Sequence, residues 1–227
     1  MRTFHKYDNL SYYWTVFKVI ILFFFTISNL SSSENKIGSI TQLNGDVIAI
    51  TESGDERQLQ VFDEIYLLDE ILIGESSSAT IQFSDSTTII LKELTSLNIT
   101  EFEKSEAKNI FRSKLGKGEI IIESGSIAKN KNGNMLVDLS NMSLGVRGTR
   151  INVGSKEDGK SEVALAEDSF GDIGEIEIDT EGQKTNLSSV EEVVEVNNNR
   201  EINTRQQSQE KKKELLAVNE TLVSVSK

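Results

Sequence analysis

Short apolar segments separated by turn residues run along most of the chain, from Ile37 to Leu187. Several alternate apolar and polar positions, which is typical of strands that bury one face. The strands predicted from this pattern cover residues 37–43, 46–50, 58–61, 70–73, 79–83, 87–91, 119–122, 135–139, 150–153, 162–165 and 175–178. Roughly a dozen strands at this spacing predict an all-β fold, either a single sandwich or an irregular β-roll.

Two segments depart from this pattern. Residues 96–114 carry many charges and predict a short helix or a charged loop. Residues 188–227 are rich in Gln, Glu, Lys and Asn, and their apolar positions keep no heptad. We therefore expect a β-domain over residues 34–187, followed by a polar tail over residues 188–227 that is partly helical or disordered.

The first 33 residues have the layout of a targeting segment. Basic residues precede an apolar run at 19–27, and the small residues Ser31 to Ser33 follow it. This order is typical of a secretory signal peptide, and the run is shorter than the ~20 residues of a membrane helix. The alternative is an inner-membrane anchor through residues 12–30, in which Lys18 snorkels. Either reading predicts an exported protein, in the periplasm or at the cell surface.

Composition limits the partners and the chemistry. The chain has 24 basic and 36 acidic residues, and its part after residue 33 carries a net charge of −14, which disfavours nucleic acid. There is no cysteine, and the single histidine is His5, in the targeting segment. Catalytic triads, cysteine nucleophiles and His/Cys zinc sites are thus excluded from a cleaved chain. We predict a protein that is not an enzyme and needs no cofactor, with a carboxylate-pair hydrolase as a distant alternative.

A glycine-flanked arginine precedes the β-branched segment at 149–153. The motif consists of Gly145, Val146, Arg147, Gly148 and Thr149. Glycine adopts backbone angles that other residues avoid, so the motif predicts a tight turn that places Arg147 just before the start of a strand. The guanidinium group then either binds an anionic partner molecule or braces the turn internally, through hydrogen bonds to backbone carbonyls and to the carboxylate of Asp85. We favour the brace.

The motif resembles the Val-Arg-Gly-Thr signature of the FecR-type domain, a β-rich module of bacterial envelope proteins. Residues 37–47, 68–85 and 115–129 are similar to other stretches of that family. The resemblance implies an exported binding module whose partner is an envelope protein or a surface glycan. The alternative that it implies is a membrane-anchored signal-transduction partner of an envelope receptor. About eleven residues precede the apolar segment, too few for a cytoplasmic anti-sigma region, so we do not expect sigma-factor regulation.

Acidic residues cluster just before the last predicted strand and at its start. Asp168, Asp172 and Glu175 offer the oxygen ligands that Ca²⁺ prefers. No known calcium-loop spacing occurs there, so a solvated strand edge is favoured and no metal is expected. The sequence does not indicate an oligomeric state.

Overall fold

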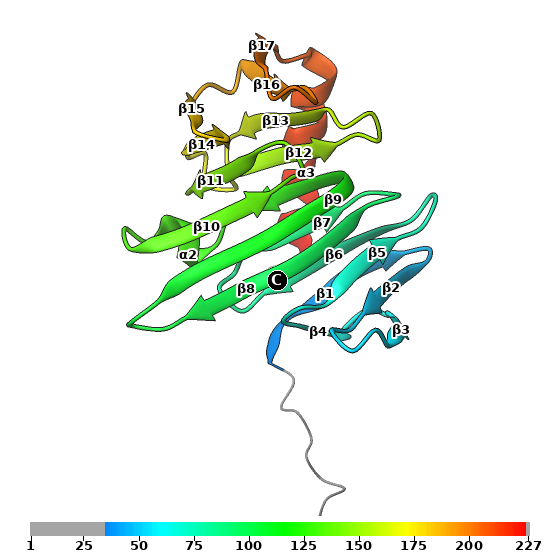
Figure 1. The fold of residues 1–227 in the computed structure, drawn as a ribbon. Coiled ribbons are helices and arrows are strands. Elements are labelled where there is room, and N and C mark those ends of the chain that lie inside the picture. Colours follow the sequence, from blue (N-terminus) through cyan, green and yellow to red (C-terminus); the bar gives the residue numbers. More distant parts are fainter. Residues whose placement is uncertain (1–34, 226–227) are drawn as a thin grey trace, which may run out of the picture. The chain divides into compact units, whose positions relative to one another are not determined.

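Seventeen β-strands form most of the described part of the chain, and the predicted all-β fold is confirmed (Figure 1). This computed structural model describes residues 35–225, so the predicted signal or anchor segment lies outside the described residues. The elements are β1 (Lys36–Asn44), β2 (Val47–Ile50), β3 (Glu56–Gln58), β4 (Glu64–Tyr66), β5 (Glu70–Ile73), β6 (Ser78–Phe83), β7 (Thr88–Leu91), β8 (Ser96–Lys104), β9 (Asn109–Glu123), α2 (Ser126–Lys129), β10 (Gly133–Asp138), β11 (Ser143–Arg147), β12 (Arg150–Ser155), β13 (Ser161–Ala166), β14 (Glu175–Thr180), β15 (Gln183–Leu187), β16 (Glu192–Val196), β17 (Ile202–Gln206) and α3 (Gln209–Val225).

Hydrogen bonding arranges the strands in two series that share β9. The first sheet has the order β4-β1-β6-β7-β9-β12-β13-β16-β17. The second sheet has the order β3-β2-β5-β8-β9-β10-β11-β14-β15. Of these pairings only β9 with β10 is parallel. Most strands are thus joined antiparallel, as expected for chain segments linked by short turns.

Strand β9 passes from one sheet to the other at Gly118. Residues before it pair with β8, and residues after it pair with β7 and β12. Gly118 has a φ of +90°. A Cβ atom there would lie 2.3 Å from Thr95 Oγ1, so the close approach of the two segments requires glycine.

The main core unites buried side chains of both sheets, among them Ile71 and Leu144 of the second sheet and Ile122 of the first. A second, smaller cluster lies under α3 and includes Ile121 and Leu215. The consecutive isoleucines of β9 therefore serve both clusters. This strand is buried on both faces because α3 covers the outer face of the first sheet.

Helix α3 is held on the first sheet by ion pairs as well as by Leu215 (red in Figure 1). Lys211 pairs with Glu119 of β9, and Glu214 pairs with Lys92. Burial would by itself raise the pKa of Glu119, but hydrogen bonds from Lys211, Lys92 and Asn152 lower it to about 2. Within residues 35–225, none of the helices has the length and apolar character needed to span a membrane.

Two sequence-based predictions of secondary structure are wrong. Residues 96–114, expected as a helix or charged loop, form β8 and the first part of β9. A register shift between Ile99 and Glu101 interrupts the alternation of β8, so its pattern does not read as a strand. The segment assigned to the polar tail contains β16 and β17, which continue the first sheet beyond β13. Its helical part begins at Gln209 and forms α3.

Candidate functional site

The predicted motif lies at one end of the sheets, together with three other segments. These are the turn at Asp85, the start of α2, and the loop of residues 167–174. Register places them together, because Glu123 of β9 is opposite both Thr88 of β7 and Arg150 of β12. In the second sheet, Arg147 is opposite Glu175, which follows the loop. We call this region the motif end.

Asp85 is fully buried, and it organises α2 rather than the motif. Its carboxylate accepts hydrogen bonds from the backbone nitrogen and the hydroxyl of Thr87, at 2.9 and 2.8 Å. It also accepts one from the backbone nitrogen of Ile127 at 3.3 Å, and its carbonyl accepts one from Ser126. The expected pairing of Asp85 with Arg147 is therefore wrong.

Arg147 ends β11 with an exposed side chain. No described residue forms a hydrogen bond or an ion pair with its guanidinium group. The tight turn also begins later than expected, because Gly145 lies within β11 and Gly148 adopts a positive φ of 55°. The internal brace predicted for Arg147 is thus absent from that position.

The bracing arginine is Arg150, whose side chain is 0% exposed. Its Nε donates to Glu123 at 2.7 Å, and its Nη2 donates to the hydroxyl of Ser169 at 3.0 Å. Its Nη1 donates to the carbonyl of Leu215 at 3.3 Å. Arg150 therefore joins β9, the 167–174 loop and α3, and a planar guanidinium suits such a divergent set of acceptors.

The sequence offered only a weak signal for this role. Ile151 and Val153 point into the main core. Alternation then places Arg150 on the outer face of the first sheet, where the side chain of a strand residue is normally exposed to solvent. The burial comes from α3, which the sequence does not place against β12.

Thr149 connects the motif to its neighbours. Its backbone nitrogen donates to the hydroxyl of Ser124 at 2.7 Å, and its own hydroxyl donates to the carbonyl of Ala166 at 3.0 Å. Val146 is 2% exposed and belongs to the main core. Val146 and Thr149 are therefore fully incorporated in the packing of the motif end, in contrast to Arg147.

The acidic residues considered for calcium are not gathered around a common point. Asp168 is buried and accepts hydrogen bonds from Lys129 Nζ at 2.8 Å and from the backbone nitrogens of Phe170 and Asp172, both at 2.9 Å. Burial would raise the pKa of Asp168, but these bonds lower it below its usual value. Glu175 instead accepts a hydrogen bond from Asn186. In the described part of the chain, no three His, Cys, Asp or Glu residues could together hold a metal ion.

The outer face of the motif end exposes apolar groups, one of them beside a cation. Phe170 is 83% exposed and Ile173 is 47% exposed. Lys129 Nζ lies 5.1 Å from the centre of the Phe170 ring. The loop rests on the end of β11, where a Cβ atom on Gly174 would lie 1.9 Å from the carbonyl of Arg147. We call Lys129, Arg147, Phe170 and Ile173 the motif surface. In the sequence, this surface is indicated only by a phenylalanine in a polar loop.

Comparison with known proteins finds a family match over part of the chain and solved structures with a similar fold. Residues 69–169 match the family model described as FecR protein. Two crystal structures of a "putative anti-sigma factor" from Parabacteroides distasonis ATCC 8503 have similar folds. One has a TM-score of 0.52 at 20% identity over 64% of this chain, and the other 0.51 at 19% over 63%. The chain spans 62% and 61% of their lengths. No curated protein matches the chain.

Proposed function

From the match of residues 69–169 to the FecR family model we propose that the protein is an exported, signalling-related module that binds an envelope protein through the motif surface. The module is proposed to act by binding and not by catalysis. In support, the chain has no cysteine and its only histidine is His5. At the motif end, the buried carboxylates of Asp85 and Asp168 are occupied by internal hydrogen bonds.

The observation that carries this proposal is the exposed Phe170 ring on a well-tethered loop. Its neighbour Asp168 anchors the loop through Lys129, and the backbone nitrogen of Ser169 donates to Glu123 at 2.8 Å. An aromatic ring held in water by an ordered loop contributes little to folding. Preformed aromatic side chains are instead typical centres of binding energy at protein interfaces.

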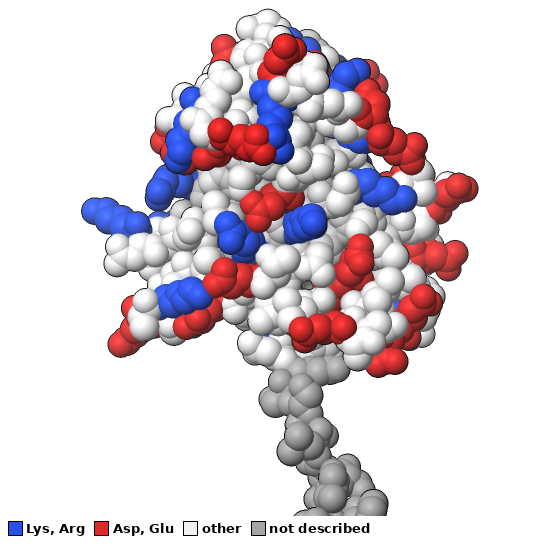
Figure 2. All heavy atoms as spheres, viewed as in Figure 1, with Lys and Arg blue, Asp and Glu red and all other residues white. Residues whose placement is uncertain are grey.

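The cations of the motif surface favour a particular kind of partner. Arg147 has no acidic partner among the described residues, although the chain as a whole is acidic. Figure 2 shows basic and acidic side chains interspersed on the visible face, so most cations have acidic neighbours. An exposed guanidinium at the end of β11, together with an exposed ring on the loop that rests against that strand end, fits a protein surface that offers an apolar recess and a carboxylate.

Export is the second part of the proposal, and it rests on the layout of residues 1–33. A cleaved segment gives a free periplasmic or surface protein. A retained one gives a membrane-anchored partner of an envelope receptor, which is the alternative form of the same function. Intact-mass measurement distinguishes them, because a species that begins at Met1 contradicts cleavage.

A site-specific crosslink tests the binding surface. A benzophenone amino acid replaces Phe170 in the full chain, and the matched control carries it at Phe62, which is also 83% exposed but lies in the turn between β3 and β4. We expect a discrete adduct with an envelope protein from position 170 only, and we expect Arg147→Glu to abolish it. Equal adducts from both positions, an adduct made of carbohydrate, or no adduct would each contradict the proposal.

A further inference from the structure

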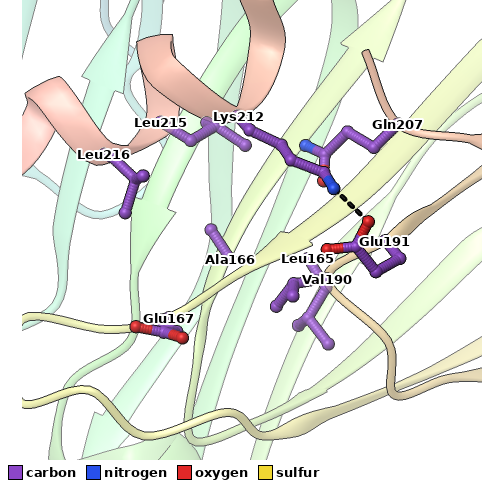
Figure 3. Close-up of a pocket in the computed structure, with 9 residues that line it drawn as sticks. All are labelled: Leu165, Ala166, Glu167, Val190, Glu191, Gln207, Lys212, Leu215 and Leu216. Atoms are coloured by element: carbon purple, nitrogen blue, oxygen red, sulfur yellow. Dashed lines mark hydrogen bonds and ion pairs between the residues drawn. The ribbon is translucent and has the colours of Figure 1, made fainter. Parts of the chain in front are cut away.

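A cavity of about 180 Å³ lies between α3 and the end of β13 (Figure 3). We call it the helix pocket. It is lined by Leu165, Ala166, Glu167, Val190, Glu191, Gln207, Lys212, Leu215 and Leu216. Most of these side chains are apolar. None of the four residues of the motif surface lines this pocket.

The unusual residue in the helix pocket is Gln207. It is 5% exposed, and its side-chain nitrogen has no hydrogen-bond partner among the described residues. Its backbone nitrogen donates to the carbonyl of Glu191 at 2.7 Å, which fixes the residue beside the pocket. Figure 3 shows its amide end directed toward α3, near Lys212. A buried amide donor without an acceptor is costly, so native structures normally satisfy it.

The charged groups at the rim restrict what the pocket accepts. Lys212 forms an ion pair with Glu191, drawn as a dashed line in Figure 3. Glu167 is exposed at the same rim and has no cationic partner among the described residues. Among the lining residues, Lys212 is the only cation and Glu191 neutralises it, whereas the carboxylate of Glu167 has no such partner. An anionic ligand would meet like charge here, whereas an uncharged ligand would not.

We propose that the helix pocket binds a small uncharged apolar molecule that carries one hydrogen-bond acceptor oxygen. The acceptor pairs with the side-chain nitrogen of Gln207, and the apolar body packs against Ala166, Val190 and Leu215. Size supports this class, because an apolar cavity of about 150 Å³ holds benzene. A six-membered ring bearing a ketone or an ester therefore matches the volume, the lining and the unpaired donor.

The walls of the pocket are fixed by the motif end. The carbonyl of Ala166 accepts from Thr149 at 3.0 Å, and the carbonyl of Leu215 accepts from Arg150 at 3.3 Å. These bonds hold β13 and α3 on either side of the cavity. A pocket with walls held in this way is formed before its ligand arrives, which is the usual condition of small-molecule sites.

Titration of the full chain with three matched probes tests the proposal. Cyclohexanone has the ring and the acceptor, cyclohexane has the ring alone, and cyclohexanecarboxylate adds a negative charge. Binding is followed by saturation-transfer NMR. We expect cyclohexanone to bind about tenfold more tightly than either of the others, as one satisfied donor predicts. Equal affinities, tighter binding of the carboxylate, or no binding of cyclohexanone would overturn the proposal.

Variants connect the affinity to this pocket. Gln207→Leu removes the donor, and cyclohexanone should then bind no better than cyclohexane. Gln206→Leu is the matched control, because Gln206 is exposed and does not line the pocket, and it should keep the tenfold preference. Leu216→Asp alters a rim residue that is 51% exposed, so the fold is retained while cyclohexanone binding is weakened. An unchanged preference in Gln207→Leu, or unchanged affinity in Leu216→Asp, would place the ligand elsewhere.

Discussion

Replacement of Arg150 by methionine should be among the most damaging single changes in the described part of the chain. The side chain is fully buried, and it donates hydrogen bonds to Glu123, Ser169 and Leu215. Methionine fills a similar volume but donates none of these bonds. Glu123, whose side chain is 12% exposed, would then keep its negative charge without a cationic partner.

The expected cost follows from that unpaired charge. Breaking a buried ion pair by removing one partner typically costs about 3–5 kcal/mol, because the remaining charge stays desolvated. The same substitution at Arg147 provides the control. Arg147 is exposed and has no ion pair with a described residue, so Arg147→Met should change the free energy of unfolding by no more than about 0.5 kcal/mol.

Urea denaturation of the full chain, followed by circular dichroism, measures both free energies of unfolding. The double variant Arg150→Met/Glu123→Gln should recover part of the loss, because it removes the orphaned charge. The reasoning fails if Arg147→Met destabilises the protein as much as Arg150→Met does. It also fails if the double variant is less stable than Arg150→Met by the full cost of a second independent mutation.

Two further predictions concern β9. The pKa of Glu119 is about 2 in the folded state against 4.5 ordinarily, so its ionised form stabilises the fold above pH 4.5 and this contribution is lost as the pH falls through 2. Its side chain is 32% exposed, so after solvent screening we expect a loss of about 1–2 kcal/mol, measured as a pH-dependent free energy of unfolding that is flatter in Glu119→Gln. Gly118→Ala should cost more than about 2 kcal/mol in the same denaturation assay, because the new Cβ meets Thr95 at a positive φ. Gly154→Ala, where no atom lies within 4 Å of the new Cβ, should be close to neutral, and equal losses at the two glycines would contradict this.

Alternation of apolar and polar residues was sufficient to predict the all-β fold and many of its strands. A side-chain period of two is a local property, so it is visible in a segment such as Glu175–Thr180. Prediction failed in β8, where a register shift after Ile99 breaks the period. It failed again in β16, where Val193 faces α3 and Val194 faces the main core, so both faces are apolar.

The motif shows the same difference between what a local pattern predicts and what it does not, now for single residues. The sequence predicts a glycine turn before a strand, and Gly148 forms that turn, later than expected, within the residues that match the FecR family model. The sequence pattern indicated Arg147 as the internal brace, but Arg150, three residues further along the chain, forms the internal hydrogen bonds. The two arginines have the same chemistry, and only the packing of α3 over one of them makes the difference.

The sequence by itself thus determined the class of fold, the acidic charge, the lack of cysteine and the position of the motif. These depend on composition and on neighbours within a few residues. The tertiary structure decided which arginine is buried, where Phe170 is exposed, and that Gln207 lies beside Leu215 without a hydrogen-bond partner. Those properties depend on contacts between segments far apart in the chain. No local pattern encodes such contacts, because burial is a property of the whole packed arrangement.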